Sequence, residues 1–189
     1  MASFTRALAG LLKIEGGYVN DPDDLGGETY RGIARRYNAD WSGWARIDQA
    51  KRGRGFPASL ERDTALRNAV RQFYKQRYWD PYQGTAIADQ AIAAKLLDIA
   101  VNLGVARAVT FLQRALNVLN RDGALYPDLQ ADGAFGPQTQ TALTTYRKKD
   151  KPVFLLKTLN ILQGMHYIES IESDATREKY ARGWLKRVG

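Results

Sequence analysis

The residues best suited to chemistry lie in an acidic, glycine-rich stretch near the N-terminus, from Glu15 to Gly32. Glu15 continues the interior-facing side of a predicted helix whose apolar residues are Phe4, Leu8, Leu11 and Leu12. Gly16 and Gly17 then supply a backbone that ends a helix, so the carboxylate meets the negative end of the helix dipole. Partial burial and this dipole both favour the protonated acid, which is the form that a glycosidase uses to protonate a leaving-group oxygen.

A second set of acids follows on the predicted loop. Asp21, Asp23 and Asp24 come soon after Glu15, and the glycine pairs on either side allow the loop to fold back toward it. That arrangement would give the pair of carboxyl groups used in glycoside hydrolysis. Simpler interpretations stay open, because a glutamate in a last helical turn is more often only solvated, and residues 20–24 also have the composition of a plain turn.

This stretch resembles the signature of glycoside hydrolase family 108, the N-acetylmuramidases found as phage endolysins and as related bacterial muramidases. The resemblance rests on Glu15-Gly-Gly-Tyr-Val-Asn-Asp-Pro-Asp-Asp and on Gly26-Gly-Glu-Thr-Tyr-Arg-Gly-Ile, with Leu25 where the family pattern has proline. It implies that Glu15 is the catalytic glutamate. The order Glu15, Asp24, Thr29 is also similar to the phage-lysozyme triad of glutamate, aspartate and threonine, and implies catalytic roles for Asp24 and Thr29.

Composition restricts the other classes of chemistry. The chain has 189 residues, no cysteine and a single histidine, which excludes disulfides, thiolate metal sites and multi-histidine metal centres. No metal or organic cofactor is expected. The net charge of +8 indicates an anionic partner, which could be nucleic acid or a bacterial envelope. The basic residues are spread along the chain rather than gathered in one stripe, and charge alone does not decide between these partners. With the muramidase resemblance, we expect an anionic envelope surface and no nucleic acid.

No stretch approaches the roughly 20 apolar residues of a membrane span, so stable membrane insertion is not expected. The apolar segment before Lys13 is short and belongs to the predicted first helix, so it is not expected to be a cleavable signal peptide. We expect synthesis in the cytoplasm and action on the cell wall in the periplasm after release, which the endolysin resemblance implies is holin-dependent. The protein is expected to be a monomer.

Apolar periodicity and helix breakers predict an all-α fold, a lysozyme-like helical bundle with at most a small β-hairpin. The expected helices cover residues 4–15, 29–37, 60–78 with Ser59 as cap, 89–103, 106–120, 136–149, 152–173 and 175–188, and residues 38–57 are expected to be irregular. We place a muramidase catalytic region at residues 1–91 and a helical peptidoglycan-binding region at residues 92–189, packed as one compact unit.

The helix predicted over 89–103 is apolar nearly all round, as a buried helix is, with a single polar stripe formed by Lys95, Asp98 and Asn102. This stripe predicts either contact with substrate or a loop, or only a pair between Lys95 and Asp98. Further along, Asp132-Gly-Ala-Phe-Gly-Pro-Gln-Thr resembles the repeat signature of peptidoglycan-binding modules, in which proline starts a helix.

These features predict a peptidoglycan-degrading N-acetylmuramidase that hydrolyses the β-1,4 bond between N-acetylmuramic acid and N-acetylglucosamine. Glu15 would protonate the linkage oxygen, Asp24, or else Asp21, would stabilise the oxocarbenium-like transition state, and Thr29 would place the attacking water. Candidate substrate-binding residues are Asp21, Tyr30, Trp41, Asp98 and Asn102. Trp41 is either a saccharide platform or part of a small core. The alternatives are a lytic transglycosylase that forms anhydro sugars and a non-catalytic protein that binds cell wall or nucleic acid.

Overall fold

The structure is a computed structural model that describes residues 1–20 and 27–189, apart from the side chains of Ile14 and Glu15. It is mainly α-helical with one small sheet, which confirms the predicted fold class. The chain forms two compact units, which we call the N-terminal unit (residues 4–77) and the C-terminal unit (residues 1–3 and 78–189). No helix within the described residues is long and apolar enough to cross a membrane.

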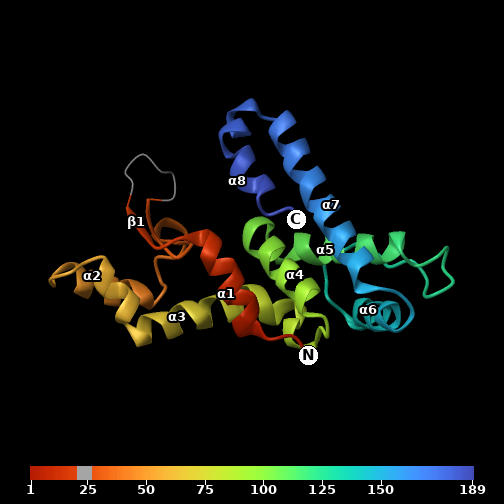
Figure 1. Ribbon diagram of the computed structural model, residues 1–189, viewed down its shortest axis with the longest axis horizontal. Helices are drawn as coiled ribbons and strands as arrows, with labels where there is room; N and C mark the ends of the chain where they lie inside the picture. Colours follow the sequence, from red (N-terminus) through yellow and green to blue (C-terminus); the bar gives the residue numbers. More distant parts are fainter. Residues whose placement is uncertain (21–26) are drawn as a thin grey trace. The chain divides into compact units, whose positions relative to one another are not determined.

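The N-terminal unit combines helices with a small antiparallel sheet (Figure 1). Its elements are α1 (Phe4–Glu15), β1 (Tyr18–Asn20), β2 (Glu28–Tyr30), β3 (Ile33–Ala34), the 3-10 turn η1 (Arg35–Tyr37), α2 (Gly43–Lys51), the 3-10 turn η2 (Ala58–Arg62) and α3 (Thr64–Tyr74). The strands lie in the order β1-β2-β3, so β2 is the middle strand. Gly16, with a φ of 73°, ends α1 in the left-handed conformation that favours glycine, as its position predicts.

The helix predicted over residues 29–37 is wrong, because this segment contains β2, β3 and η1. Arg31 and Gly32 have φ angles of 47° and 79°, which no α-helix accommodates. They form a tight two-residue turn that pairs Tyr30 with Ile33 across the two strands. The hydroxyl of Tyr74 on α3 donates to the carbonyl of Arg31 at 2.7 Å and so holds this turn against the helix.

Two further predictions in this unit need correction. Residues 38–57 are not wholly irregular, because α2 forms there and buries Trp44 and Ile47, which lie one turn apart on the side that faces α3. The helix predicted from Leu60 begins only at Thr64. Its cap is Asp63 rather than Ser59, since the Asp63 carboxylate accepts from the backbone N–H of Leu66 at 2.9 Å.

The C-terminal unit is built from five α-helices and short helical turns within the described residues. Its elements are the end of the π-helical turn η3 (Lys75–Trp79), the 3-10 turns η4 (Asp80–Tyr82) and η5 (Gly84–Ala86), α4 (Gln90–Leu103), α5 (Val105–Val118), α6 (Pro137–Lys149), α7 (Pro152–Glu172), the 3-10 turn η6 (Ala175–Tyr180) and α8 (Ala181–Leu185). Helix α4 packs on both α5 and α7, which explains why it is apolar nearly all round.

The last segment of the chain folds back along α7 (Figure 1). The helix predicted over 175–188 is interrupted, since η6 precedes the short helix α8. The Trp184 ring stacks on Tyr167 of α7 with 5.3 Å between ring centroids, while Leu185 stays exposed. The end of the chain therefore packs on α7 through Trp184 and not through Leu185.

Candidate active site

The predicted acid, Glu15, is the last residue of α1, and its side chain lies outside the described part of the structure. Asp21 and Asp24 also lie outside the described residues. Their roles stay predictions. The backbone around them is described on both sides, because β1 and β2 pair in antiparallel register with Asn20 opposite Glu28. The segment that contains Asp21 and Asp24 therefore connects Asn20 and Glu28, two residues that lie opposite each other in the sheet.

Thr29 lies on the middle strand β2, opposite Val19 of β1. Its hydroxyl donates to the carbonyl of Gly27 at 3.3 Å and is partly exposed, so its oxygen can still accept a hydrogen bond. The backbone N–H of Arg31 donates to the carbonyl of Gly17 at 3.0 Å. This bond ties the chain just after Glu15 to the turn that follows Thr29, so the end of α1 and strand β2 are held side by side.

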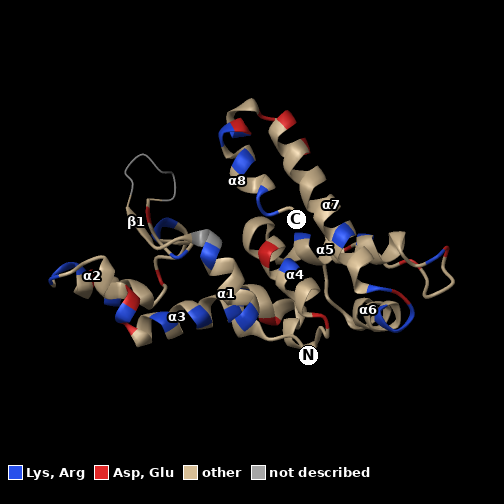
Figure 2. Cartoon of the chain, viewed as in Figure 1, with Lys and Arg blue, Asp and Glu red and all other residues tan. Residues whose placement is uncertain are grey.

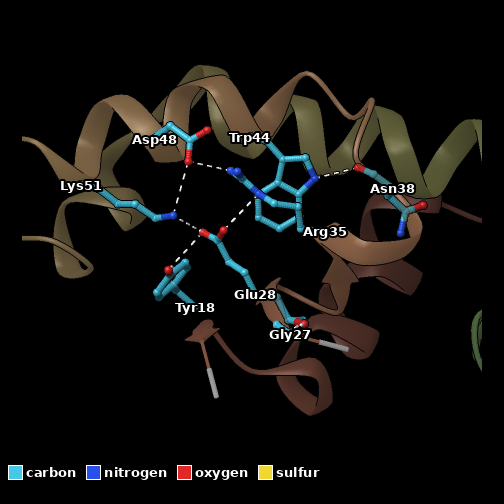
Figure 3. Close-up of polar contacts among 9 residues, drawn as sticks. Tyr18, Gly27, Glu28, Arg35, Asn38, Trp44, Asp48 and Lys51 are labelled. Carbon is cyan, nitrogen blue, oxygen red and sulfur yellow. Dashed lines mark hydrogen bonds and ion pairs between the residues drawn. The ribbon is translucent and has the colours of Figure 1, made fainter. Parts of the chain in front are cut away.

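A network of charged side chains surrounds Glu28 on the same strand (Figure 3). One oxygen of Glu28 lies 2.6 Å from the Lys51 ammonium and accepts from the Tyr18 hydroxyl at 3.0 Å. The other oxygen lies 3.0 Å from the guanidinium of Arg35. Asp48 closes the network, at 2.7 Å from Arg35 and 3.3 Å from Lys51. Two anions and two cations thus alternate in a ring that joins β2 to α2.

The ring is further fixed by aromatic side chains. The guanidinium carbon of Arg35 lies 4.6 Å from the centre of the Trp44 ring, and the indole N–H of Trp44 donates to the carbonyl of Asn38 at 2.7 Å. The pKa of Asp48 is lowered, chiefly by its hydrogen bond from Arg35. Burial and the neighbouring Glu28 carboxylate both raise the pKa of Tyr18, so its hydroxyl remains a hydrogen-bond donor at neutral pH.

Sequence reasoning missed this role of Glu28. The Glu28 side chain is 11% exposed and both of its oxygens are occupied by protein partners. It therefore serves as a counter-ion that joins the strand to the helix rather than as a proton donor to substrate. Its partners lie at irregular separations along the chain, so neither helical nor strand spacing predicts the ring.

Two of the predicted substrate-binding residues belong to the aromatic core of the N-terminal unit. Tyr30 is completely buried, with 0% exposure, so its ring offers no surface to a substrate. Trp41 is 9% exposed and packs edge-on against Trp44 at 5.2 Å. One edge of Trp41 also lines a surface groove of about 260 Å³ together with Phe73. Most of the Trp41 ring thus belongs to the core, and only one edge of the ring faces the groove.

Asp98 and Asn102 lie in the C-terminal unit, where Asp98 holds the end of the chain. The Asp98 carboxylate pairs with Arg187 at 2.7 Å and accepts from Gln163 of α7 at 2.9 Å. Asn102 donates to the carbonyl of Asp98 at 3.0 Å. Lys95, the remaining member of the polar stripe, donates to the carbonyl of Arg187 at 2.6 Å. Lys95 and Asp98 of the stripe therefore bind the C-terminal segment, a partner that no pattern in the sequence indicates.

The motif around Asp132 is organised by one buried side chain that sequence reasoning did not single out. Gln113 on α5 is 2% exposed. Its amide nitrogen donates to Asp132 at 2.8 Å and to Thr139 at 3.1 Å, and its oxygen accepts from the backbone N–H of Gly133 at 2.9 Å. Helix α6 begins at Pro137, as the motif predicts.

Comparisons with known proteins agree with this description. Residues 8–104 match the family model described as Glycosyl hydrolase 108, and residues 107–189 match the one described as Predicted Peptidoglycan domain. Helix α4 falls inside the first match although it packs on α5 and α7. The boundary predicted between residues 91 and 92 stays a prediction.

The fold also resembles a solved structure, that of Brucella abortus SagA. The two chains share 23% identity with a TM-score of 0.63, over 98% of this chain and 88% of the other. No curated protein matches the sequence. The first family match covers more than half of the chain and confirms the resemblance seen in the motif that begins at Glu15. The protein is therefore a member of the glycosyl hydrolase 108 family, a glycoside hydrolase that acts on peptidoglycan.

Proposed function

We propose that the protein is an N-acetylmuramidase that hydrolyses the β-1,4 bond between N-acetylmuramic acid and N-acetylglucosamine, with Glu15 as the general acid. The observation that carries this proposal is the position of Glu15 at the end of α1, directly before Gly16 and within the matched family region. The neighbouring glutamate, Glu28, has both oxygens engaged by Tyr18, Lys51 and Arg35 and does not compete for the role.

In the proposed reaction the Glu15 carboxylic acid gives its proton to the linkage oxygen as the bond from that oxygen to the anomeric carbon breaks. The positive charge that develops on the sugar requires a nearby carboxylate. Asp24 is the first candidate and Asp21 the second, on the basis of the family motif. A water molecule then adds to the anomeric carbon and loses its proton to a carboxylate. Thr29 is proposed to orient this water, since its hydroxyl oxygen keeps acceptor capacity beside its bond to Gly27.

Replacing Glu15 with glutamine tests the assignment, because the amide keeps the shape of the side chain and cannot donate the proton. We expect Glu15→Gln to abolish the release of fragments from purified sacculi, with a melting temperature equal to or above that of the wild type. The matched control is Glu61→Gln, since Glu61 lies on η2, where its carboxylate is about half exposed and pairs with Arg31. Full activity of Glu15→Gln would reject the assignment.

Mass spectrometry of the wild-type products tests the bond and the type of reaction. Hydrolysis adds water and leaves a reducing N-acetylmuramic acid end, whereas a lytic transglycosylase leaves a 1,6-anhydro sugar that is lighter by one water. Products that end in reducing N-acetylglucosamine would instead indicate a glucosaminidase. Asp24→Asn and Asp21→Asn, compared in the same assay, decide which aspartate supplies the second charge. A near-normal rate in both variants would mean that neither aspartate supplies this charge.

A further inference from the structure

A groove of about 320 Å³ opens on the C-terminal unit, between the loop that follows α5 and the first turns of α6. The loop wall consists of Tyr126, Pro127, Asp128 and Leu129, and the helix wall of Pro137, Gln138, Thr141 and Ala142. The groove lies within residues 107–189, the part matched by the peptidoglycan family model, and has no role in the chemistry described above. Its volume falls in the range of small-molecule binding sites.

The loop wall is held rigidly although it has no regular secondary structure. Asn117 of α5 clamps Leu129 at both backbone groups, donating to its carbonyl and accepting from its N–H, each at 2.8 Å. Asn120, which is buried, donates to the Asp128 carboxylate at 2.7 Å. The Tyr126 hydroxyl donates to the carbonyl of Leu116 at 3.0 Å, and burial raises its pKa to about 12. This wall therefore needs little ordering when a ligand binds.

The helix wall is held from the same side of α5. Gln113 bonds to Thr139 in the first turn of α6 and to the backbone just before it. Gln113, Asn117 and Asn120 are spaced by four and three residues, so they form one row along α5 and the turn that ends it. Burying amides is costly unless each is satisfied, and here the row of amides fixes both walls of one groove.

The chemistry of the groove selects a neutral ligand with apolar faces and amide groups. Five of its lining residues are apolar or aromatic, Gln138 offers an amide and Thr141 a hydroxyl. Its one ionisable carboxylate, Asp128, already accepts from Asn120. None of these lining residues, all of them described, is lysine or arginine, although the chain carries a net charge of +8. The basic residues of α6 lie in its last turn (blue in Figure 2), whereas the helix wall of the groove is formed by its first turns.

We propose that this groove is a second glycan-binding site that holds an N-acetylhexosamine unit of the peptidoglycan strand. The apolar walls would contact the acetamido methyl and the C–H face of the sugar, and Gln138 and Thr141 would bond to its amide and hydroxyl groups. The carboxylates of the stem peptide are disfavoured, because the groove supplies no cation to them. This inference rests on the proposed action on the glycan strand, and it assigns strand binding to residues of the C-terminal unit that have no role in bond cleavage.

The experiment is an NMR titration of the full-length, ¹⁵N-labelled protein with a neutral tetramer of N-acetylglucosamine. We expect the tetramer to shift the backbone amide signals of Leu129 and Thr141. In Thr141→Arg, whose longer charged side chain would occupy the groove, the affinity read from these signals should fall by about tenfold or more. Thr144→Arg is the matched control, since Thr144 is an exposed threonine on the same helix outside the groove. Circular dichroism confirms that both variants are folded.

Three results would overturn the proposal. The tetramer could leave the groove signals unchanged, Thr141→Arg could bind as tightly as the wild type, or a stem peptide without sugar could shift the groove signals where the tetramer does not. Failure of the proposed muramidase function is read separately, from product masses and from the activity of Glu15→Gln. Because the NMR signals report only on the C-terminal groove, the two failures are distinguishable.

Discussion

Replacing Asp98 with asparagine should destabilise the C-terminal unit without slowing hydrolysis. The Asp98 and Arg187 side chains are 15% and 11% exposed, and they lie 2.7 Å apart. The neutral amide would remove the carboxylate charge beside this nearly buried guanidinium, and Lys95 donates to the backbone carbonyl of the same arginine. Breaking a buried ion pair lowers the free energy of unfolding by about 3–5 kcal/mol. Because the two side chains keep some contact with water, we expect a loss at the lower end of this range, about 3 kcal/mol.

For a chain of this size, a loss of about 3 kcal/mol corresponds to a fall in melting temperature of roughly 6–12 °C. Thermal unfolding followed by tryptophan fluorescence is a suitable assay, because Trp184 stacks on Tyr167 within the same unit. A double-mutant cycle with Arg187→Met isolates the pair. The double variant should lose less than the sum of the single losses, since the interaction between the two side chains is lost in each single variant and is counted twice in that sum.

The same variants decide between the structural role and the substrate contact that the sequence suggests for Asp98. Activity on sacculi is measured well below the melting temperatures of all variants, so that only folded protein contributes. A melting temperature within about 1 °C of the wild type, combined with a tenfold loss of kcat/KM, would refute the structural argument. Asp98 would then return to the substrate-binding residues.

Two other predictions concern charge. Glu28→Gln should cost about 2 kcal/mol in the free energy of unfolding, because Lys51 and Arg35 lose their shared partner; urea unfolding measures this, and an unchanged midpoint would contradict the ring of charges. Burial, helped by the positive charge of Arg107, lowers the pKa of His166, so the unfolded chain binds that proton at a higher pH than the folded protein does. Stability should therefore be unaffected by His166 above about pH 7.5 and decline as the pH falls through about 6.5. Urea midpoints measured in His166→Gln should lack this part of the decline, and an identical pH dependence in both proteins would exclude His166 as its source.

The helices of the C-terminal unit were accessible from the sequence because local rules decide them. Gly104 ends α4 with a φ of 88°, and Pro137 and Pro152 stand at the first positions of α6 and α7. Apolar periodicity between such breakers is sufficient to place a helix. The bounds of α4, α5, α6 and α7 then differ from expectation by only one or two residues, which is the usual variation at helix ends, whereas the helix predicted over 175–188 is interrupted.

The sheet of the N-terminal unit was not accessible, because its turn departs from local preference. Arg31 adopts a left-handed backbone conformation that is typical of glycine or asparagine, so an arginine at this position did not indicate a hairpin. What holds it is tertiary, namely the bond from Tyr74 and the pairing of Tyr30 with Tyr18 across the sheet. Helix propensity in so short a segment is readily overridden by such contacts.

In the candidate site, too, residues close together in sequence were predictable, whereas contacts between residues far apart in sequence were not. The motif predicts roles for Glu15 and Thr29 from residues that lie close together in sequence, and these roles stay predictions. The partners of Asp98, by contrast, are Gln163 and Arg187, which are 65 and 89 residues away along the chain. No spacing rule reaches that far. A polar stripe on a buried helix therefore predicts that a partner exists, and only the fold tells whether that partner is a substrate or the end of the same chain.

The ring around Glu28 bears directly on the identity of the proton donor. A general acid needs an oxygen that faces the linkage and carries a transferable proton. Neither oxygen of Glu28 is free to face the linkage, because Lys51 and Tyr18 occupy one oxygen and Arg35 the other. This supports the proposal that Glu15, the other glutamate in the motif, has the role. The same change to glutamine should have different effects at the two positions. At Glu28 the lost counter-ion lowers stability, whereas at Glu15 the lost proton lowers the rate and leaves stability intact.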